Sequence, residues 1–149
     1  MVARRKSAGA PAVTQAKPAS KATRAANSAV TKLLDFGDRR DFEDAQRGFV
    51  AALDPAVIKG ADGRVAWDME QYAFLDAQAP DTVNPSLWRQ AQLNRISGLF
   101  TIHPRIHQVR GHDLSNMTLI QGDTGWIIID PLTSTEVASA ALALARRTI

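Results

Sequence analysis

Three histidines are the residues of this chain whose chemistry first suggests a metal site. His103 and His107 stand four positions apart, a spacing that places two metal ligands on one face of a helix. Pro104 lies between them, however, and the surrounding residues alternate between apolar and polar, as they do in a strand. Strand residues four positions apart are separated by about 13 Å, which is too far for one ion. The pattern therefore predicts two partly exposed histidines on a strand and its turn.

The pair His112–Asp113 supplies at most two ligands, fewer than a zinc site needs. The chain contains no cysteine, which excludes a disulfide, a thiolate zinc site and a cysteine nucleophile. A Ser-His-Asp triad can be drawn from Ser115, His112 and Asp130, but no nucleophile-elbow motif surrounds Ser115. The residues alone thus predict neither a catalytic residue nor a metal ligand.

The basic residues are concentrated in the first part of the chain. Seven of them and no acid precede Asp35, whereas the rest has 15 acidic and 11 basic residues, a net charge of −4. The composition predicts a disordered basic leader over residues 1–24. The acidic remainder predicts no nucleic-acid partner, although a non-enzymatic interaction module with a basic tail is one alternative.

No apolar run resembles a signal-peptide core or reaches the length of a transmembrane helix. This favours a cytoplasmic location. The Arg/Ser-rich, acid-free leader leaves an organelle transit peptide as an alternative.

Residues 25–98 are predicted to form a mostly helical segment with one short hairpin. Ser20 can cap a helix of about residues 21–34, and Asp38 a second helix that Pro55 ends. Asp62–Gly63 marks a hairpin turn between residues 57–58 and 65–67. After the Asp68/Gln71 capping box we expect a short helix that buries Tyr72, Phe74 and Leu75. A further helix is expected to begin at Pro85 and to be capped at its C-terminus by Gly98. The three tryptophans are expected to be core residues: Trp67, Trp88 and Trp126.

Residues 99–149 are predicted to form strands followed by one helix. Apolar residues recur at strand spacing in 100–102, 106–109 and 117–120, and residues 126–130 read as a buried strand. Ser134 or Thr135 can cap the last helix, whose inner face would carry Val137, Ala141 and Leu144.

Four stretches taken together resemble the N-terminal region of the alkylsulfatases, the SDS-hydrolase-type alkyl/aryl sulfatases of the metallo-β-lactamase superfamily. They are DRRDFEDAQRGFVA, ADGRVAWDMEQYAFL, APDTVNPSLWRQAQLNRISGLF and QVRGHDLSNMTLIQGDTGWIIIDPLTS, and the resemblance covers about residues 25–147. It implies an α/β (α+β) fold: an N-terminal helical prelude, then the first β-strands and helix of an αββα sandwich, incomplete, with that truncated domain over residues 99–149.

The resemblance also implies an activity, the hydrolysis of primary alkyl sulfate esters such as dodecyl sulfate to an alcohol and sulfate. Such enzymes use a binuclear zinc site, bound first by a His-x-His-x-Asp-His motif, and they dimerise through C-terminal regions. This sequence contains no His-x-His motif, so we expect no zinc and no activity in this chain alone. The alternative is another hydrolase of the superfamily.

Two sets of residues acquire roles from the resemblance. Asp130 matches a structural position beside the metal loop. The loop after residue 110 matches a region that can overhang the active site, which implies substrate-facing roles for His112, Asp113, Leu114 and Asn116. Position 112 is expected to be aromatic in much of the family, which argues against a catalytic imidazole there.

Overall fold

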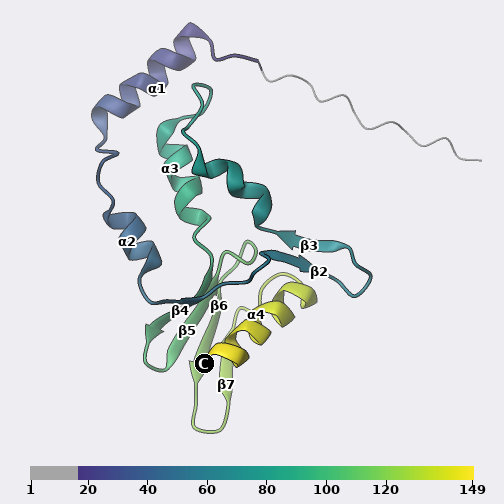
Figure 1. The fold of residues 1–149 in the computed structure, drawn as a ribbon. Helices are drawn as coiled ribbons and strands as arrows, with labels where there is room; N and C mark the ends of the chain where they lie inside the picture. The colour runs from purple at the N-terminus through teal and green to yellow at the C-terminus, as the bar shows by residue number, and fades with distance from the viewer. Residues whose placement is uncertain (1–16) are drawn as a thin grey trace, which may run out of the picture.

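A five-stranded antiparallel sheet forms the centre of residues 17–149, the part of the chain that this computed structural model describes (Figure 1). The strands lie in the order β1-β4-β5-β6-β7, and β2 and β3 form a separate hairpin. The strands are β1 (Phe49–Ala51), β2 (Val57–Lys59), β3 (Val65–Asp68), β4 (Gly98–His103), β5 (Ile106–Arg110), β6 (Met117–Gln121) and β7 (Trp126–Ile129). The helices are α1 (Lys21–Leu33), α2 (Arg40–Gln46), the 3-10 helix η1 (Glu70–Asp76), α3 (Pro85–Asn94) and α4 (Thr135–Thr148). The expected α+β class is confirmed.

Helix α4 covers one face of the sheet (Figure 1). Ser134 caps it by accepting a hydrogen bond from the Val137 amide, and the predicted inner face is confirmed. Alternating residues of the strands supply the other half of the core, because side chains two apart in a strand share a face. The buried cluster comprises Leu99, Val109, Met117, Leu119, Ala141, Leu144 and Ala145.

The opposite face of the sheet stays open at β7, the edge strand. Ile127 is 61% exposed and Ile129 52% exposed. The prediction of a buried strand here is therefore wrong. The apolar run does form a strand, but α4 packs on the other face of the sheet and no described element covers these side chains.

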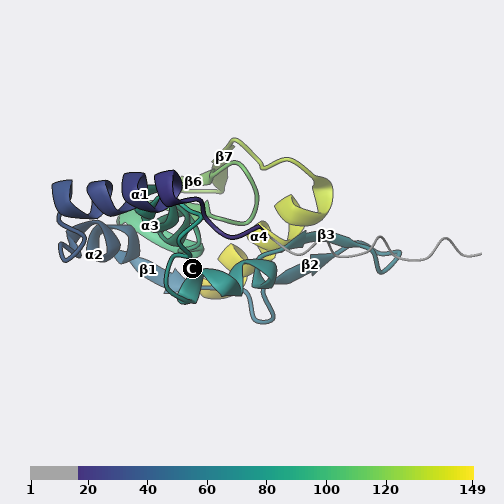
Figure 2. The ribbon, with the colours of Figure 1, turned by 90° about the horizontal axis from the view of Figure 1, so that it is seen from above.

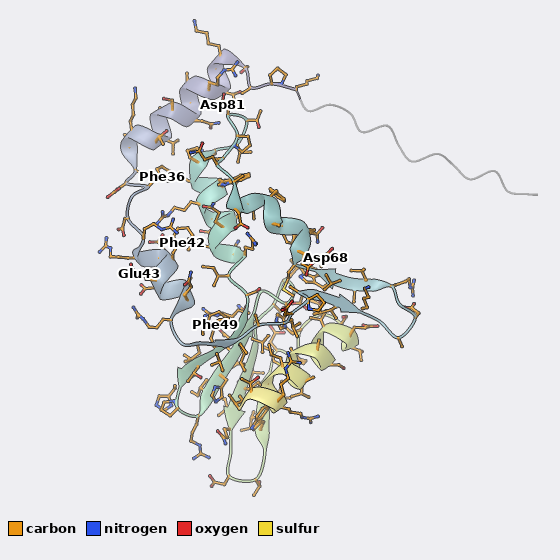
Figure 3. All side chains as sticks on the ribbon, viewed as in Figure 1. Phe36, Phe42, Glu43, Phe49, Asp68 and Asp81 are labelled. Atoms are coloured by element: carbon orange, nitrogen blue, oxygen red, sulfur yellow. The ribbon has the colours of Figure 1, made fainter. Side chains whose placement is uncertain are left out.

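Helices α1, α2 and α3 lie together to one side of the sheet, and the β2–β3 hairpin lies beside α4 (Figure 2). Asp81 lies next to α1, where its carboxylate pairs with Arg24 and its carbonyl accepts a hydrogen bond from Asn27 (Figure 3). Phe42 of α2 is buried beneath the guanidinium groups of Arg39 and Arg89, whose carbons lie 3.6 and 4.9 Å from its ring centroid.

Helix α1 begins directly after Ser20, whose hydroxyl accepts a hydrogen bond from the Thr23 amide at 3.0 Å. Residues 21–24 are therefore helical, and the predicted disordered leader of residues 1–24 extends too far. The leader's first 16 residues lie outside the described part of the chain.

The second helix is shorter than predicted. It ends at Gln46, and Gly48 then adopts a positive φ of 74°. Phe49 and Ala51 pair with β4 instead of continuing the helix, because the strand hydrogen bonds and the Phe49–Phe100 ring contact outweigh the helical periodicity.

The β2–β3 hairpin is confirmed, but two details of the segments after it differ from the prediction. Only Leu75 of the expected apolar set in η1 is buried, whereas Tyr72 and Phe74 are exposed. Asn84 caps α3 as predicted, yet this helix ends at Asn94 and Gly98 opens β4, opposite Arg110.

Candidate functional site

A cavity of about 600 Å³ opens between the β2–β3 hairpin, η1, α3 and the loop of residues 111–116. Its walls are mostly apolar. Trp67 and Met69 come from the end of the hairpin, and Leu75 comes from η1. A cavity of this size and lining suits a small organic molecule.

The loop of residues 111–116 brings three of the four predicted substrate-facing residues to this cavity. Asp113, Leu114 and Asn116 line it, and Leu114 is 87% exposed. His112 does not line the cavity and is only 1% exposed. The fourth residue is thus placed behind the cavity wall in this chain.

Asp113 ties the loop to the segment before α4. Its carboxylate accepts hydrogen bonds from the amide of Ser115 and from the amide and hydroxyl of Thr133, each at 2.7 Å. Burial raises the pKa of this carboxyl, but the three hydrogen bonds and the neighbouring His112 together bring the pKa below its usual value. The geometry makes Asp113 a fixed anion that shapes the loop.

His112 is held in its neutral form by burial. Desolvation lowers the pKa of its imidazole to about 4, against the opposing effect of the Asp113 charge. Its Nδ1 atom is buried without a hydrogen-bond partner among the described residues. Asp130 is exposed with a φ of 53°, and no hydrogen bond joins His112 to it or to Ser115 within residues 17–149. The structure therefore does not assemble the imagined triad.

Arg110, at the end of β5, lines the cavity and was not predicted as a site residue from the sequence. Its guanidinium carbon lies 3.6 Å from the ring centroid of Phe100, and it donates a hydrogen bond to the carbonyl of Ala45 at 3.2 Å. The Nε atom is buried and lacks a partner in the described chain. No sequence signal identifies this arginine as a site residue. The alternation of a strand predicts which face a side chain lies on, but it does not predict which distant segments form a cavity around that side chain.

The other histidines are spread over two strands. His103 is exposed at the end of β4, whereas His107 of β5 is buried, with Nδ1 3.1 Å from the Thr101 hydroxyl. The expectation of partial exposure is thus wrong for His107. Nowhere in residues 17–149 do three histidine or carboxylate side chains gather as a metal would require.

Curated relatives match most of this chain at high identity. A Pseudomonas (R)-specific secondary-alkylsulfatase is 56% identical over 129 residues, which are 86% of this chain. The alkyl/aryl-sulfatase BDS1 of Saccharomyces cerevisiae is 54% identical and a Pseudomonas linear primary-alkylsulfatase 53% identical, each over 87% of the chain. This chain is a relative of the alkylsulfatases. It spans about one fifth of the length of these relatives, 19–20%.

The fold agrees with that of a solved alkylsulfatase. The stereoselective inverting sec-alkylsulfatase Pisa1 from Pseudomonas superposes with a TM-score of 0.82 at 55% identity, over 88% of this chain and 21% of that one. A double mutant of the same enzyme gives the same values. No family model matches the chain. Among the described helices of this alkylsulfatase relative, none combines the length and the apolarity needed to cross a membrane.

Proposed function

We propose that this chain is an N-terminal part of a protein that hydrolyses primary alkyl sulfate esters, such as dodecyl sulfate, to an alcohol and inorganic sulfate. The identity of 53–56% to three alkylsulfatases, over nearly the whole chain, carries the proposal. The apolar cavity beside the 111–116 loop is compatible with a substrate that has a long hydrocarbon part. The expected homodimer and the cytoplasmic location stay predictions.

Zinc is part of this proposal for the whole enzyme, which we place in the metallo-β-lactamase superfamily. Two zinc ions would activate a water molecule and offset charge on the sulfate oxygens. The residues described here do not fit such a site, because no three ligand side chains converge. We therefore assign no catalytic step to this chain; its residues provide a framework and a cavity wall.

An activity assay on the isolated chain tests the expectation that residues 1–149 alone do not hydrolyse alkyl sulfates. Purified residues 1–149, supplied with zinc, should release no sulfate from dodecyl sulfate above the buffer background. The measurement is ion chromatography of sulfate over several hours, with the Pseudomonas linear primary-alkylsulfatase as the positive control. Sulfate release by the isolated chain would overturn the expectation that this chain alone is inactive.

A chimera tests the substrate class. Residues 17–149 would replace the matching segment of the linear primary-alkylsulfatase, and hydrolysis of dodecyl sulfate would be compared with that of a secondary octyl sulfate. We expect the primary ester to be the better substrate. A reversed preference, with the parent enzyme unchanged, would contradict the primary-ester proposal.

A further inference from the structure

We propose that the cavity between the β2–β3 hairpin and the 111–116 loop binds an amphiphilic anion, with Arg110 at its head group and the apolar wall along its hydrocarbon chain. The choice of an alkyl sulfate as this anion rests on the function proposed above. The site lies wholly within residues 17–149, so binding to it can be measured without catalysis.

The first argument is the state of Arg110. Arginine stays charged in proteins, and a cation without a counter-ion favours the binding of an anion. The Arg110 side chain is half-buried, and its one hydrogen bond to the described part of the chain goes to the neutral carbonyl of Ala45. Within residues 17–149, no carboxylate lies within 4.0 Å of this guanidinium, and its Nε atom has no partner. Burial lowers the pKa of Arg110, in agreement with an incompletely paired charge. A sulfate group in the cavity would supply the counter-charge that this guanidinium lacks.

The other charged groups of the cavity are already engaged. Arg95 forms an ion pair with Asp76, which lies outside the cavity lining. The Asp113 carboxylate is occupied by the Ser115 and Thr133 donors described above. Arg110 is therefore the cation left for a ligand.

The second argument is the wall next to that charge. Trp67, Met69 and Leu75 face the same cavity as Arg110, with Leu93 of α3 and the exposed Leu114. Apolar surface together with one cation that has no carboxylate partner among residues 17–149 matches a molecule with a hydrocarbon chain and one anionic group. Inorganic sulfate would use only the cation, and a long-chain alcohol only the wall.

The test is a titration of the full 149-residue chain with octyl sulfate below its micelle concentration, followed by tryptophan fluorescence, to which Trp67 contributes, and by amide NMR shifts. Octanol and inorganic sulfate are titrated in parallel. We expect octyl sulfate to bind about tenfold or more tightly than octanol, because only octyl sulfate can form a charge-assisted hydrogen bond with the guanidinium. Equal affinities for octyl sulfate and octanol would overturn the proposal.

Variants locate the binding. Arg110→Gln should weaken octyl sulfate binding about tenfold while octanol binding stays unchanged. The control Arg105→Gln removes an exposed cation that pairs with Asp123 away from the cavity, and should change neither affinity. A parallel loss for both ligands would assign Arg110 a merely structural role and contradict the proposal.

A second variant changes a side chain that is 87% exposed, so it removes little packing from the fold. Leu114→Asp places a negative charge at the exposed mouth of the cavity and should weaken octyl sulfate more than octanol. Leu87→Asp is its control, an exposed leucine of α3 that does not line the cavity. If Leu114→Asp leaves the affinity for octyl sulfate unchanged while the chimera with the linear primary-alkylsulfatase hydrolyses dodecyl sulfate, the cavity assignment fails and the proposed function stands. If the chimera is inactive while selective binding is intact, the proposed function fails and the cavity assignment stands.

Discussion

The residues of the 111–116 loop differ in role more than their adjacency in the sequence suggests. The carboxylate of Asp113 is buried and accepts three hydrogen bonds. Leu114 and Asn116 are exposed and line the cavity, whereas the His112 side chain is buried and does not line it. The sequence identified this loop through its resemblance to a family. It could not separate these roles, because they depend on contacts with Thr133, twenty positions further along the chain.

The buried imidazole predicts how stability depends on pH. The folded-state pKa of His112 is about 4, below its ordinary value of 6.5, so the unfolded chain binds the proton more readily between these values. Stability should therefore fall as the pH drops from 6.5 to 4, by on the order of 3 kcal/mol from this group, and should lose nothing more from it below pH 4. His112→Phe should flatten this dependence in thermal melts, and the exposed His103→Phe should not. An equally steep dependence in His112→Phe would refute the assignment.

Removing the Asp113 carboxylate should loosen the loop. Asp113→Ala leaves two amides and a hydroxyl without their acceptor, which should lower the free energy of unfolding by about 2–3 kcal/mol. Asp123→Ala is the matched control, because its side chain is 92% exposed and its one ion pair among residues 17–149 is with Arg105. This variant should lower the free energy of unfolding by less than about 1 kcal/mol. Urea unfolding followed by fluorescence measures both, and equal losses would contradict the structural role of Asp113.

At the scale of elements, capping and turn residues were sufficient to predict where a helix or hairpin begins, provided that no tertiary contact opposed them. The caps Ser20, Asn84 and Ser134 and the Asp62–Gly63 turn were all predictable, and each starts or joins an element as expected. The end of α2 was not predictable, because strand pairing with a segment about fifty residues away decides it. The cavity was not predictable for the same reason, since four separate segments make its walls.

Gly48 is the residue that permits the change from helix α2 to strand β1. It has a φ of 74°, and a Cβ atom there would overlap the backbone carbonyl oxygen of Thr101, whose amide donates to the Gly48 carbonyl at 2.7 Å. Gly48→Ala should therefore cost about 3 kcal/mol or more of stability. Gly63 has a similar φ of 80° but open space around it, so Gly63→Ala should cost only about 1–2 kcal/mol. Similar melting temperatures for the two variants would contradict the β1–β4 contact.

At the scale of the whole molecule, the uncovered face of the sheet is the main feature. β7 is an edge strand with exposed isoleucines, and such an edge promotes association between chains. We expect the chain to associate with increasing concentration, and Ile127→Lys to shift sedimentation-velocity profiles toward monomer. Leu87→Lys replaces an equally exposed apolar residue on α3 and should leave association unchanged. Wild-type chain that sediments as a sharp monomer at every concentration would contradict this prediction.

The relation of this chain to a working alkylsulfatase is tested most directly by sulfate release from a chimera. Residues 17–149 would replace the matching segment of the Pseudomonas (R)-specific secondary-alkylsulfatase, which is 56% identical, and the parent lacking that segment would serve as the control. We predict that the chimera hydrolyses alkyl sulfates within about tenfold of the parent rate, equivalent to about 1.4 kcal/mol in the barrier, whereas the deleted parent is inactive. A folded chimera with no more sulfate release than the deleted parent would contradict this relation.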